Sequence, residues 1–179
     1  FIVAPIGDLL AGYANILTSN SVLLSDYLMI GGLGATLFNA ATTLFLHLLM
    51  LKAMKIKLTG PIFAALLTIT GFAFFGKNIF NPLPMYFGVF LFAKATKTPF
   101  RNHIIVLLFS SGIAPIVSFL IFGAGFSLPL GIAIAIAVGT LVGFLLPAFG
   151  AHALRFHQGY NLYNTGVAMG ILSMFITGI

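Results

Sequence analysis

The 179-residue chain contains no cysteine, no tryptophan and only two acidic residues, Asp8 and Asp26. Without cysteine it cannot form a disulfide or a thiolate metal site. Neither aspartate has a histidine or serine at a recognisable catalytic spacing, and no glycine-rich phosphate-binding loop is present. A metal site would require histidines in an i, i+4 pair or a carboxylate near them. The four histidines of this chain have neither. We therefore predict that the chain is not an enzyme and holds no cofactor or metal.

Charge is also scarce, since only 6% of the residues are charged and 60% are hydrophobic. Soluble domains typically carry roughly a quarter charged residues, so the composition predicts an integral membrane protein of the all-α class. The length allows a polytopic bundle of about five or six spans of about 20 residues. The net charge of +6 comes from eight basic residues that lie mostly between apolar runs. Orientation in the bilayer explains such a distribution better than nucleic-acid binding, which we exclude.

Continuous apolar runs predict membrane spans at residues 27–51, 103–122, 128–149 and 160–179. Residues 1–25 are too interrupted by proline, glycine and polar residues for a confident span. Residues 62–75 and 85–93 are each too short to cross a bilayer, so we predict a broken hairpin over residues 60–93, either fully spanning or re-entrant.

Three basic loops, at residues 52–57, 94–101 and 152–157, lie on one side of the membrane if this hairpin returns to its starting side. The positive-inside rule then assigns them to the cytoplasm. His47 is expected to reach the cytoplasmic interface, one turn from the end of its span. Lys77, at the hairpin tip, is either solvated outside the membrane or buried and functional.

A first polar motif occupies this tip, at residues 76–84. Pro82 and Pro84 lack backbone donors and interrupt the helix, so nearby backbone groups need other partners. Asn78 and Asn81 suit either that backbone or a neutral polar solute. Three interpretations remain open: a capped extracellular loop, a re-entrant break facing a pathway, and a structural kink.

A second polar motif, at residues 157–166, precedes the last apolar run and is the natural partner of the first. Its candidate binding residues are His157, Tyr160, Asn161, Tyr163 and Asn164. If a helix begins here, the two tyrosines share a face and so do the two asparagines. An imidazole ordinarily titrates near neutrality, which suits a group that gates or relays a proton. The following Gly166-x-x-x-Gly170 is typical of close helix contact. The alternative interpretation is an interfacial anchor with a helix cap.

These motifs read Gly76-Lys77-Asn78-x-x-Asn81-x-Leu83-Pro84 and His157-x-Gly159-Tyr160-Asn161-Leu162-Tyr163-Asn164-x-Gly166. Through them the chain resembles, from about Tyr27 onward, an uncharacterised family of bacterial polytopic membrane proteins built from a duplicated domain. The resemblance implies that residues 1–179 form a single transmembrane domain, one repeat of a longer protein. It also implies the bacterial plasma membrane as its location, and it transfers no activity.

A weaker similarity runs to the urea transporter family, in which inverted repeats surround a pore for a small neutral amide. The matching segments are Asn81-Pro82 and Gly159-Tyr160-Asn161. Lys77, His157 and the two tyrosines depart from that pattern, so the substrate does not transfer. This similarity implies a channel-like fold only.

Together these features predict a transporter or channel-like protein that passes a small polar solute. Its expected partners are the lipid bilayer, the solute, and a second repeat or a second copy of the chain. The residues expected to bind the solute are Lys77, Asn78, Asn81, Pro82, His157, Tyr160, Asn161, Tyr163 and Asn164. The alternative is a non-transporting scaffold or sensor whose polar motifs bind a partner.

Overall fold

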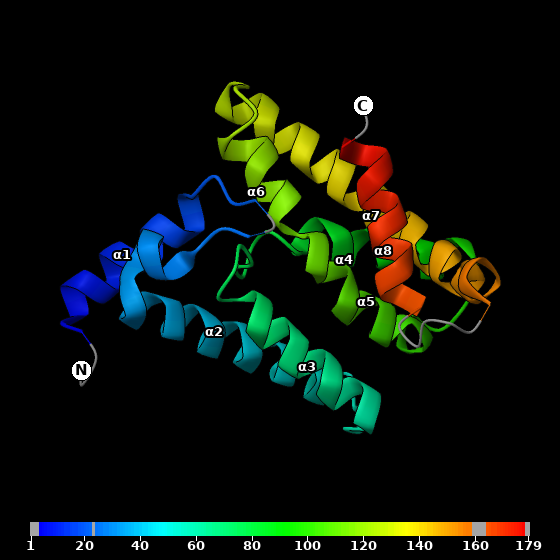
Figure 1. Cartoon of the computed structure of the whole chain (residues 1–179). Coiled ribbons are helices and arrows are strands. Elements are labelled where there is room, and N and C mark those ends of the chain that lie inside the picture. Colours follow the sequence, from blue (N-terminus) through cyan, green and yellow to red (C-terminus); the bar gives the residue numbers. More distant parts are fainter. Residues whose placement is uncertain (1–3, 23, 159–163, 178–179) are drawn as a thin grey trace.

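The computed structural model describes residues 4–22, 24–158 and 164–177. The regular secondary structure of this part of the chain is helical, and one isolated bridge joins Asp26 and Phe75. Figure 1 shows the arrangement. The α-helices are α1 (Ile6–Thr18), α2 (Tyr27–Ala53), α3 (Gly60–Phe72), α4 (Leu83–Ala95), α5 (Ile104–Ser110), α6 (Pro115–Phe122), α7 (Leu128–His157) and α8 (Asn164–Thr177), with 3-10 helices η1 (Phe100–His103) and η2 (Ser111–Ile113).

Two of the described helices, α2 and α7, are long and apolar enough to cross a membrane. A third span results if the bent pair on either side of Ala114 counts as one crossing. Helices α3, α4 and α8 are apolar but shorter. The structure thus supports a helical, membrane-embedded protein, and it does not confirm the predicted five or six spans.

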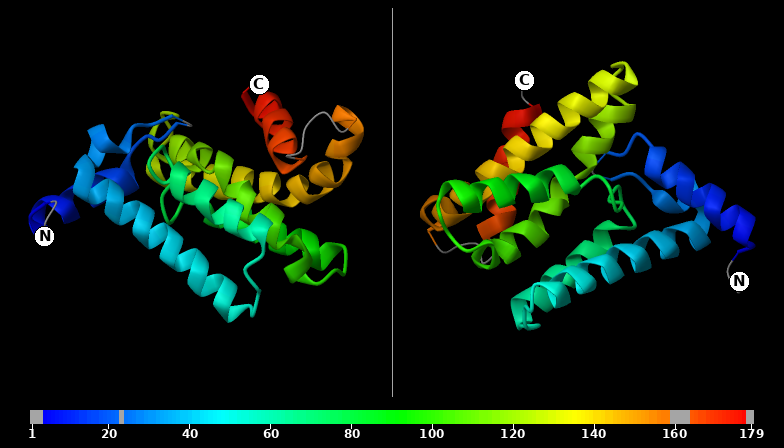
Figure 2. Two further views of the ribbon diagram at one scale, coloured as in Figure 1. Left: turned by 60° about the horizontal axis from the view of Figure 1, so that its bottom comes forward. Right: turned by 180° about the vertical axis from the view of Figure 1, so that it is seen from behind.

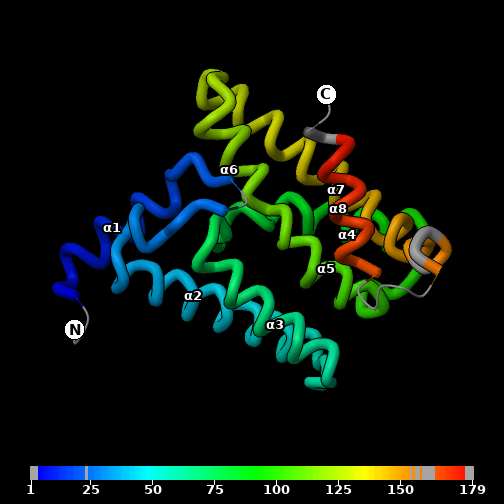
Figure 3. Tube along the Cα trace, in the orientation of Figure 1, coloured from blue at the N-terminus to red at the C-terminus, as the bar shows by residue number. Residues whose placement is uncertain are grey.

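The predicted hairpin over residues 60–93 is present as α3 and α4, joined by a non-helical segment over residues 73–82, which we call the hairpin break. Each helix has 13 residues, or about 20 Å at 1.5 Å per residue, so neither alone crosses a hydrocarbon core of about 30 Å. The tube in Figure 3 shows α3 entering the centre of the molecule and α4 returning toward the side from which α3 came. The chain therefore returns toward the side that it left, as both versions of the predicted hairpin require.

The predicted span over residues 103–122 is interrupted at its middle. Helix α5 ends at Ser110, η2 follows, and α6 begins at Pro115 with a bend of 42°. The proline lacks the backbone N–H that would continue the hydrogen-bond ladder, which favours the interruption. The chain therefore has a second break, over residues 111–114, which we call the η2 break.

Helices α4 and α7 pack closely because glycines line their contact. A side chain at Gly88 would collide with the backbone of α7 at Thr140, and one at Gly143 would collide with the backbone of Met85. Gly139 and Gly143 together form a small-x-x-x-small contact motif of the kind found between membrane helices. The close helix contact predicted at Gly166-x-x-x-Gly170 is not seen at Gly170, because a Cβ atom added there would have no described atom within 4 Å.

Helix α2 begins where the Asp26 carboxylate accepts hydrogen bonds from the backbone N–H groups of Leu28 and Met29. Gly32, with φ of +77°, then kinks it, a conformation that glycine adopts without strain. After this kink the helix runs beside α3 (Figure 1).

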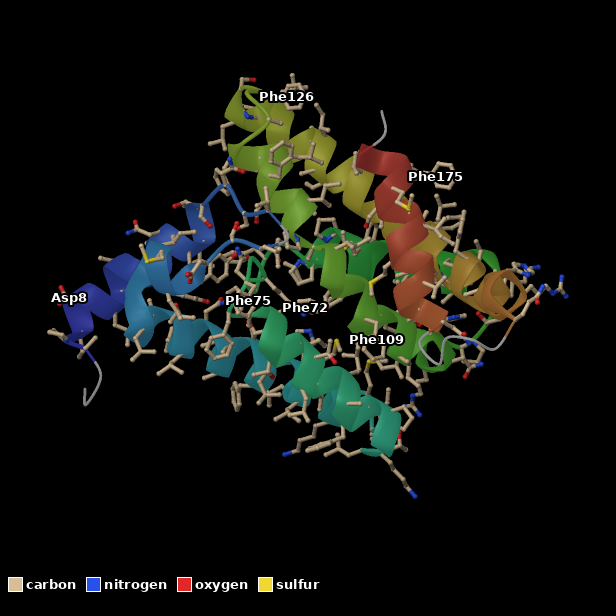
Figure 4. All side chains as sticks on the ribbon, viewed as in Figure 1. Asp8, Phe72, Phe75, Phe109, Phe126 and Phe175 are labelled. Carbon is tan, nitrogen blue, oxygen red and sulfur yellow. The ribbon has the colours of Figure 1, made fainter. Side chains whose placement is uncertain are left out.

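The ends of α2, α4 and α7, which carry the three basic loops, lie on the same side of the molecule (Figures 1 and 2). The N-terminal end of the chain and the turn between α6 and α7 lie away from that side. Figure 4 shows Asp8 and Phe126 at those distant ends. The fold is therefore compatible with the charge asymmetry in the sequence.

Candidate functional site

The polar side chains of the hairpin break are buried. Lys77 is 0% exposed, Asn78 1% and Asn81 2%, so the expectation of a solvated Lys77 is wrong. Phe75 and Phe80 of the same segment are exposed.

Within the break, Gly76 has a φ of +88°, and a side chain at this position would collide with the carbonyl oxygen of Val22. Glycine alone combines this backbone conformation with that close approach.

Two asparagines hold the backbone of the break in shape. The Asn78 side-chain oxygen accepts hydrogen bonds from the backbone N–H groups of Phe80 (2.9 Å) and Asn81 (3.1 Å). In return, the Asn81 side-chain oxygen accepts from the Asn78 N–H at 3.2 Å, and its Nδ2 donates to the Gly76 carbonyl at 2.8 Å. These amides therefore supply the partners that the interrupted helix lacks.

Asn39, on α2, closes the opposite side of the break. Its Nδ2 donates to the carbonyl oxygens of Ala73 and Lys77, both at 2.8 Å. Its side-chain oxygen is buried and has no hydrogen-bond partner among the described residues. A buried acceptor left unpaired costs about 1–3 kcal/mol, so this atom is open to a donor.

The two breaks contact each other through side chains. Lys77 Nζ donates to Ser111 Oγ in the η2 break at 2.6 Å. The Ser111 hydroxyl donates to the carbonyl of Leu108, also at 2.6 Å. Asn81 Nδ2 reaches Ser118 Oγ of α6 at 3.1 Å. The hairpin break and the η2 break thus form one buried polar centre.

His47 belongs to the same region, contrary to the expectation that it reaches the interface. It is 6% exposed, and its Nε2 lies 2.6 Å from the hydroxyl of Tyr86 on α4. Its Nδ1 lies 2.6 Å from the Thr43 carbonyl. The helix packing turns this face of α2 toward α4, which removes the imidazole from the interface.

The polar centre lies deep along both long helices. Asn39 is about two helical turns after the kink of α2 and about four turns before Ala53. On α7, the residue against Pro84 is Gly139, about three turns after Leu128 and five before His157. Figure 4 shows Phe72 and Phe75, at the start of the break, near the centre of the molecule. Break and polar centre therefore lie far from either end of the spans.

Two cavities flank the hairpin break. The α7-side cavity has a volume of about 440 Å³, and its polar lining residues are Asn78, Asn81, Ser118 and Thr140. The α2-side cavity has about 260 Å³, and its polar lining residues are Thr43, His47 and Tyr86. Leu83 lines both cavities. Most other lining side chains are apolar, as in small-molecule sites generally.

Each cavity contains one buried hydroxyl without a hydrogen-bond partner in the described structure. These are Thr43 Oγ1 on the α2 side and Thr140 Oγ1 on the α7 side. They belong to the two long helices, Thr43 to α2 and Thr140 to α7, and each threonine lines one cavity. The arrangement leaves hydrogen-bonding capacity free on either side of the break.

Only some of the predicted site residues lie in the part of the chain that the structure describes. Lys77, Asn78, Asn81 and Pro82 come together in the break, and Pro82 is buried and lines the α2-side cavity. Tyr160, Asn161, Tyr163 and the side chain of His157 lie outside the described residues, and Asn164 begins α8. The partners shown for the first motif come from α2, η2 and α6.

Sequence reasoning missed Asn39, Thr43, Ser111 and Ser118. The first two did leave a signal, because Asn39, Thr43 and His47 recur at every fourth position of an apolar span and so share one helix face. The serines gave none, since a serine in a membrane helix ordinarily bonds its own backbone.

Comparison with known proteins gives one match. No curated protein and no solved structure matches the chain. A family model described as "Protein of unknown function (DUF1576)" matches residues 6–179. This chain, in which two helix breaks meet in a buried polar centre, therefore belongs to the DUF1576 family of proteins of unknown function.

Proposed function

We propose that this chain forms part of a membrane transporter or channel that passes a small polar solute beside the hairpin break. The observation that carries the proposal is the pair of unpartnered buried hydroxyls, Thr43 Oγ1 and Thr140 Oγ1, one in each cavity. A solute with hydrogen-bonding groups satisfies them and so gains the free energy that an unpaired buried group forfeits. Broken helices at mid-membrane are the common sites of solute binding in transporters.

The cavities suggest the kind of solute. At about 260 Å³ the α2-side cavity is slightly smaller than the range of about 300–1,000 Å³ found for drug-sized ligands. The walls are largely apolar, with few polar groups at the break. We therefore favour a small, uncharged molecule that both donates and accepts hydrogen bonds.

Leu83 supports a connection between the cavities, because it is the residue at the start of α4 that lines both. We place the pathway along this side chain, with Asn78 and Asn81 lining its α7-side part. As the sequence predicts, we further propose that a second repeat or a second copy of the chain completes the pathway in a bacterial plasma membrane. The basic loops then face the cytoplasm.

The test uses proteoliposomes in a stopped-flow osmotic shrinking and swelling assay, with glycerol, urea and formamide as probes. Thr43→Val and Thr140→Val remove the free hydroxyls and preserve side-chain shape. Each should slow the entry of the permeating probe about tenfold, the effect of about 1.4 kcal/mol. Thr42→Val is the matched control, because the Thr42 hydroxyl bonds the Phe38 carbonyl of its own helix and lines neither cavity.

If vesicles with folded protein are no more permeable to these probes than empty vesicles, or if all three variants behave alike, the proposed pathway is wrong. The first of these results would favour the scaffold or sensor alternative.

A further inference from the structure

Four side chains form a continuous polar series between the α2-side cavity and the hairpin break. His47 Nε2 lies 2.6 Å from the Tyr86 hydroxyl. Ser111 Oγ accepts from Lys77 Nζ at 2.6 Å, and the Ser111 side chain lies next to the Tyr86 hydroxyl, so that it stands between the two hydrogen-bonded pairs. His47 and Tyr86 line the cavity, whereas Lys77 is fully buried. The series therefore links side chains that line a cavity to one that is fully buried.

Hydrogen-bond chemistry fixes the direction of two of these contacts. The Thr43 carbonyl beside His47 Nδ1 can only accept, so Nδ1 carries the proton of the neutral ring and Nε2 accepts from the Tyr86 hydroxyl. The Ser111 hydroxyl donates to the Leu108 carbonyl, and its oxygen accepts from Lys77. Rotation of this one hydroxyl toward Tyr86 completes a chain of donors running from Lys77 to His47.

Among the described residues no carboxylate forms an ion pair with Lys77. Asp26 is bridged through its backbone to Phe75 of the hairpin break, but its carboxylate accepts from the N–H groups of Leu28 and Met29. The two acidic residues of the chain, Asp8 and Asp26, lie in the first turn of α1 and at the cap of α2.

The titratable groups near Lys77 are His47 of α2 and Tyr86 of α4. Tyr27, at the start of α2, contacts the adjacent Asn78. An amine buried in a membrane protein without a counter-ion marks a functional group by default.

We propose that Lys77 is a proton-binding site that exchanges its proton with the α2-side cavity through Ser111, Tyr86 and His47. In this transfer Lys77 Nζ gives one proton to Ser111 Oγ, and Ser111 gives its hydroxyl proton to the Tyr86 oxygen. Tyr86 gives its own proton to His47 Nε2, and the imidazolium then releases that Nε2 proton to water in the cavity, which restores the neutral ring with its proton on Nδ1. Lys77 ends neutral, both hydroxyls keep one proton, and one proton has moved.

Proton exchange at Lys77 has a consequence for the two breaks, because Lys77 joins them. A hydrogen bond donated by an ammonium is roughly twice as strong as one between neutral groups, so protonation holds the hairpin break against the η2 break and deprotonation loosens the contact. The coupling of solute passage to proton movement rests on the proposed function. The assignment of Lys77 as a proton-binding site is independent of the proposed function.

The test measures the amine directly and needs no solute. Full-length protein with ¹⁵N-labelled lysine is placed in lipid nanodiscs, and the Lys77 Nζ resonance is identified by its absence in Lys77→Arg. We expect this resonance to shift as the bulk pH is raised from about 5 to about 10, with amine protons that exchange with water. Tyr86→Phe, which removes only the hydroxyl of the relay, should slow that exchange about tenfold.

Tyr13→Phe is the matched control, since Tyr13 packs edge-on against Phe38 outside the series, and it should leave the exchange rate unchanged. If the chemical shift of the Lys77 Nζ resonance does not change with bulk pH, the proposal is wrong. Equal exchange rates in the native protein and Tyr86→Phe, with Lys77 still buried, would also overturn it. Failure of the proposed function gives a different result. In that case Thr43→Val and Thr140→Val leave the entry rate of the probes in the vesicle assay unchanged.

Discussion

The side-chain nitrogen of Lys77 lies 2.6 Å from the hydroxyl oxygen of Ser111 and donates a hydrogen bond to it. This contact joins a lysine in the break between α3 and α4 to a serine in the break between α5 and α6. Two interruptions that are distant in the sequence thereby stabilise each other.

Ser111→Ala should therefore destabilise the protein, because it removes the one side-chain acceptor that the structure shows for Lys77. We expect a loss of about 1.5–3 kcal/mol in the free energy of unfolding, as for hydrogen bonds to charged groups. Denaturant unfolding in detergent micelles measures it. In the Lys77→Met background the same serine change should have much less effect, and equal losses in both backgrounds would contradict the pairing.

Asn39→Leu should destabilise the hairpin break, because the Asn39 amide donates to the buried carbonyls of Ala73 and Lys77. Two unsatisfied buried acceptors cost about 2–6 kcal/mol together, so thermal unfolding should begin at a markedly lower temperature. Asn102→Leu, at an exposed position in η1, is the control and should have little effect. Similar melting temperatures for the two variants would show that the amide does not hold the break.

Gly143→Ala should weaken the contact between α4 and α7, because the added methyl group meets the backbone of Met85. Overpacking of this kind costs about 1–3 kcal/mol. Gly150→Ala, on the same helix but with no neighbour within 4 Å, should be neutral or stabilising by about 1 kcal/mol. Thermal unfolding of the pair separates a packing effect from helix propensity, and the packing assignment fails if Gly143→Ala is the more stable variant.

Leu83 should control the pathway, if solute passes from one cavity to the other. Leu83→Ala shortens the side chain that lines both cavities and should speed probe entry in the vesicle assay, whereas Leu83→Trp should slow it. Leu67→Ala, at an exposed position of α3, is the control. A faster rate in Leu83→Trp would place the pathway elsewhere.

The absence of cysteine allows a direct test of orientation. Cysteine introduced by Lys55→Cys or Lys97→Cys should react with a membrane-impermeant maleimide from one side of the vesicle, and by Phe126→Cys from the other. Asn78→Cys should react slowly from both sides, because Asn78 is buried. Rapid labelling at position 78 from either bulk phase would show that the break is exposed to water and would contradict its burial.

Much of the secondary structure was predictable because membrane helices leave a strong signal in composition. The span at residues 27–51, the span at 128–149 and the hairpin over 60–93 correspond to α2, α7 and the pair α3 and α4. The bend at Pro115 also follows from the chemistry of proline. What hydropathy could not supply was the number of crossings, since α3, α4 and α8 are apolar yet short.

The candidate site was predictable on one side only. Gly76, Asn78 and Asn81 revealed the hairpin break, because a helix interruption in a membrane needs groups that satisfy its backbone. Their partners Asn39 and Ser111 lie far away in the sequence, and nothing local pairs them with the break. His47 was assigned to the interface for the same reason, since its place along α2 was known but its helix face was not.

The sequence by itself determined that this chain is helical and membrane-embedded, where its helices are interrupted, and which polar residues occupy the first interruption. These properties follow from local composition, because the bilayer requires long apolar helices and satisfied backbone groups. Only the tertiary structure decided that Lys77 is buried, that it meets Ser111, and that two cavities flank the break. Those facts depend on which helix faces turn toward one another, and close contacts such as that between Gly88 and the α7 backbone set those faces.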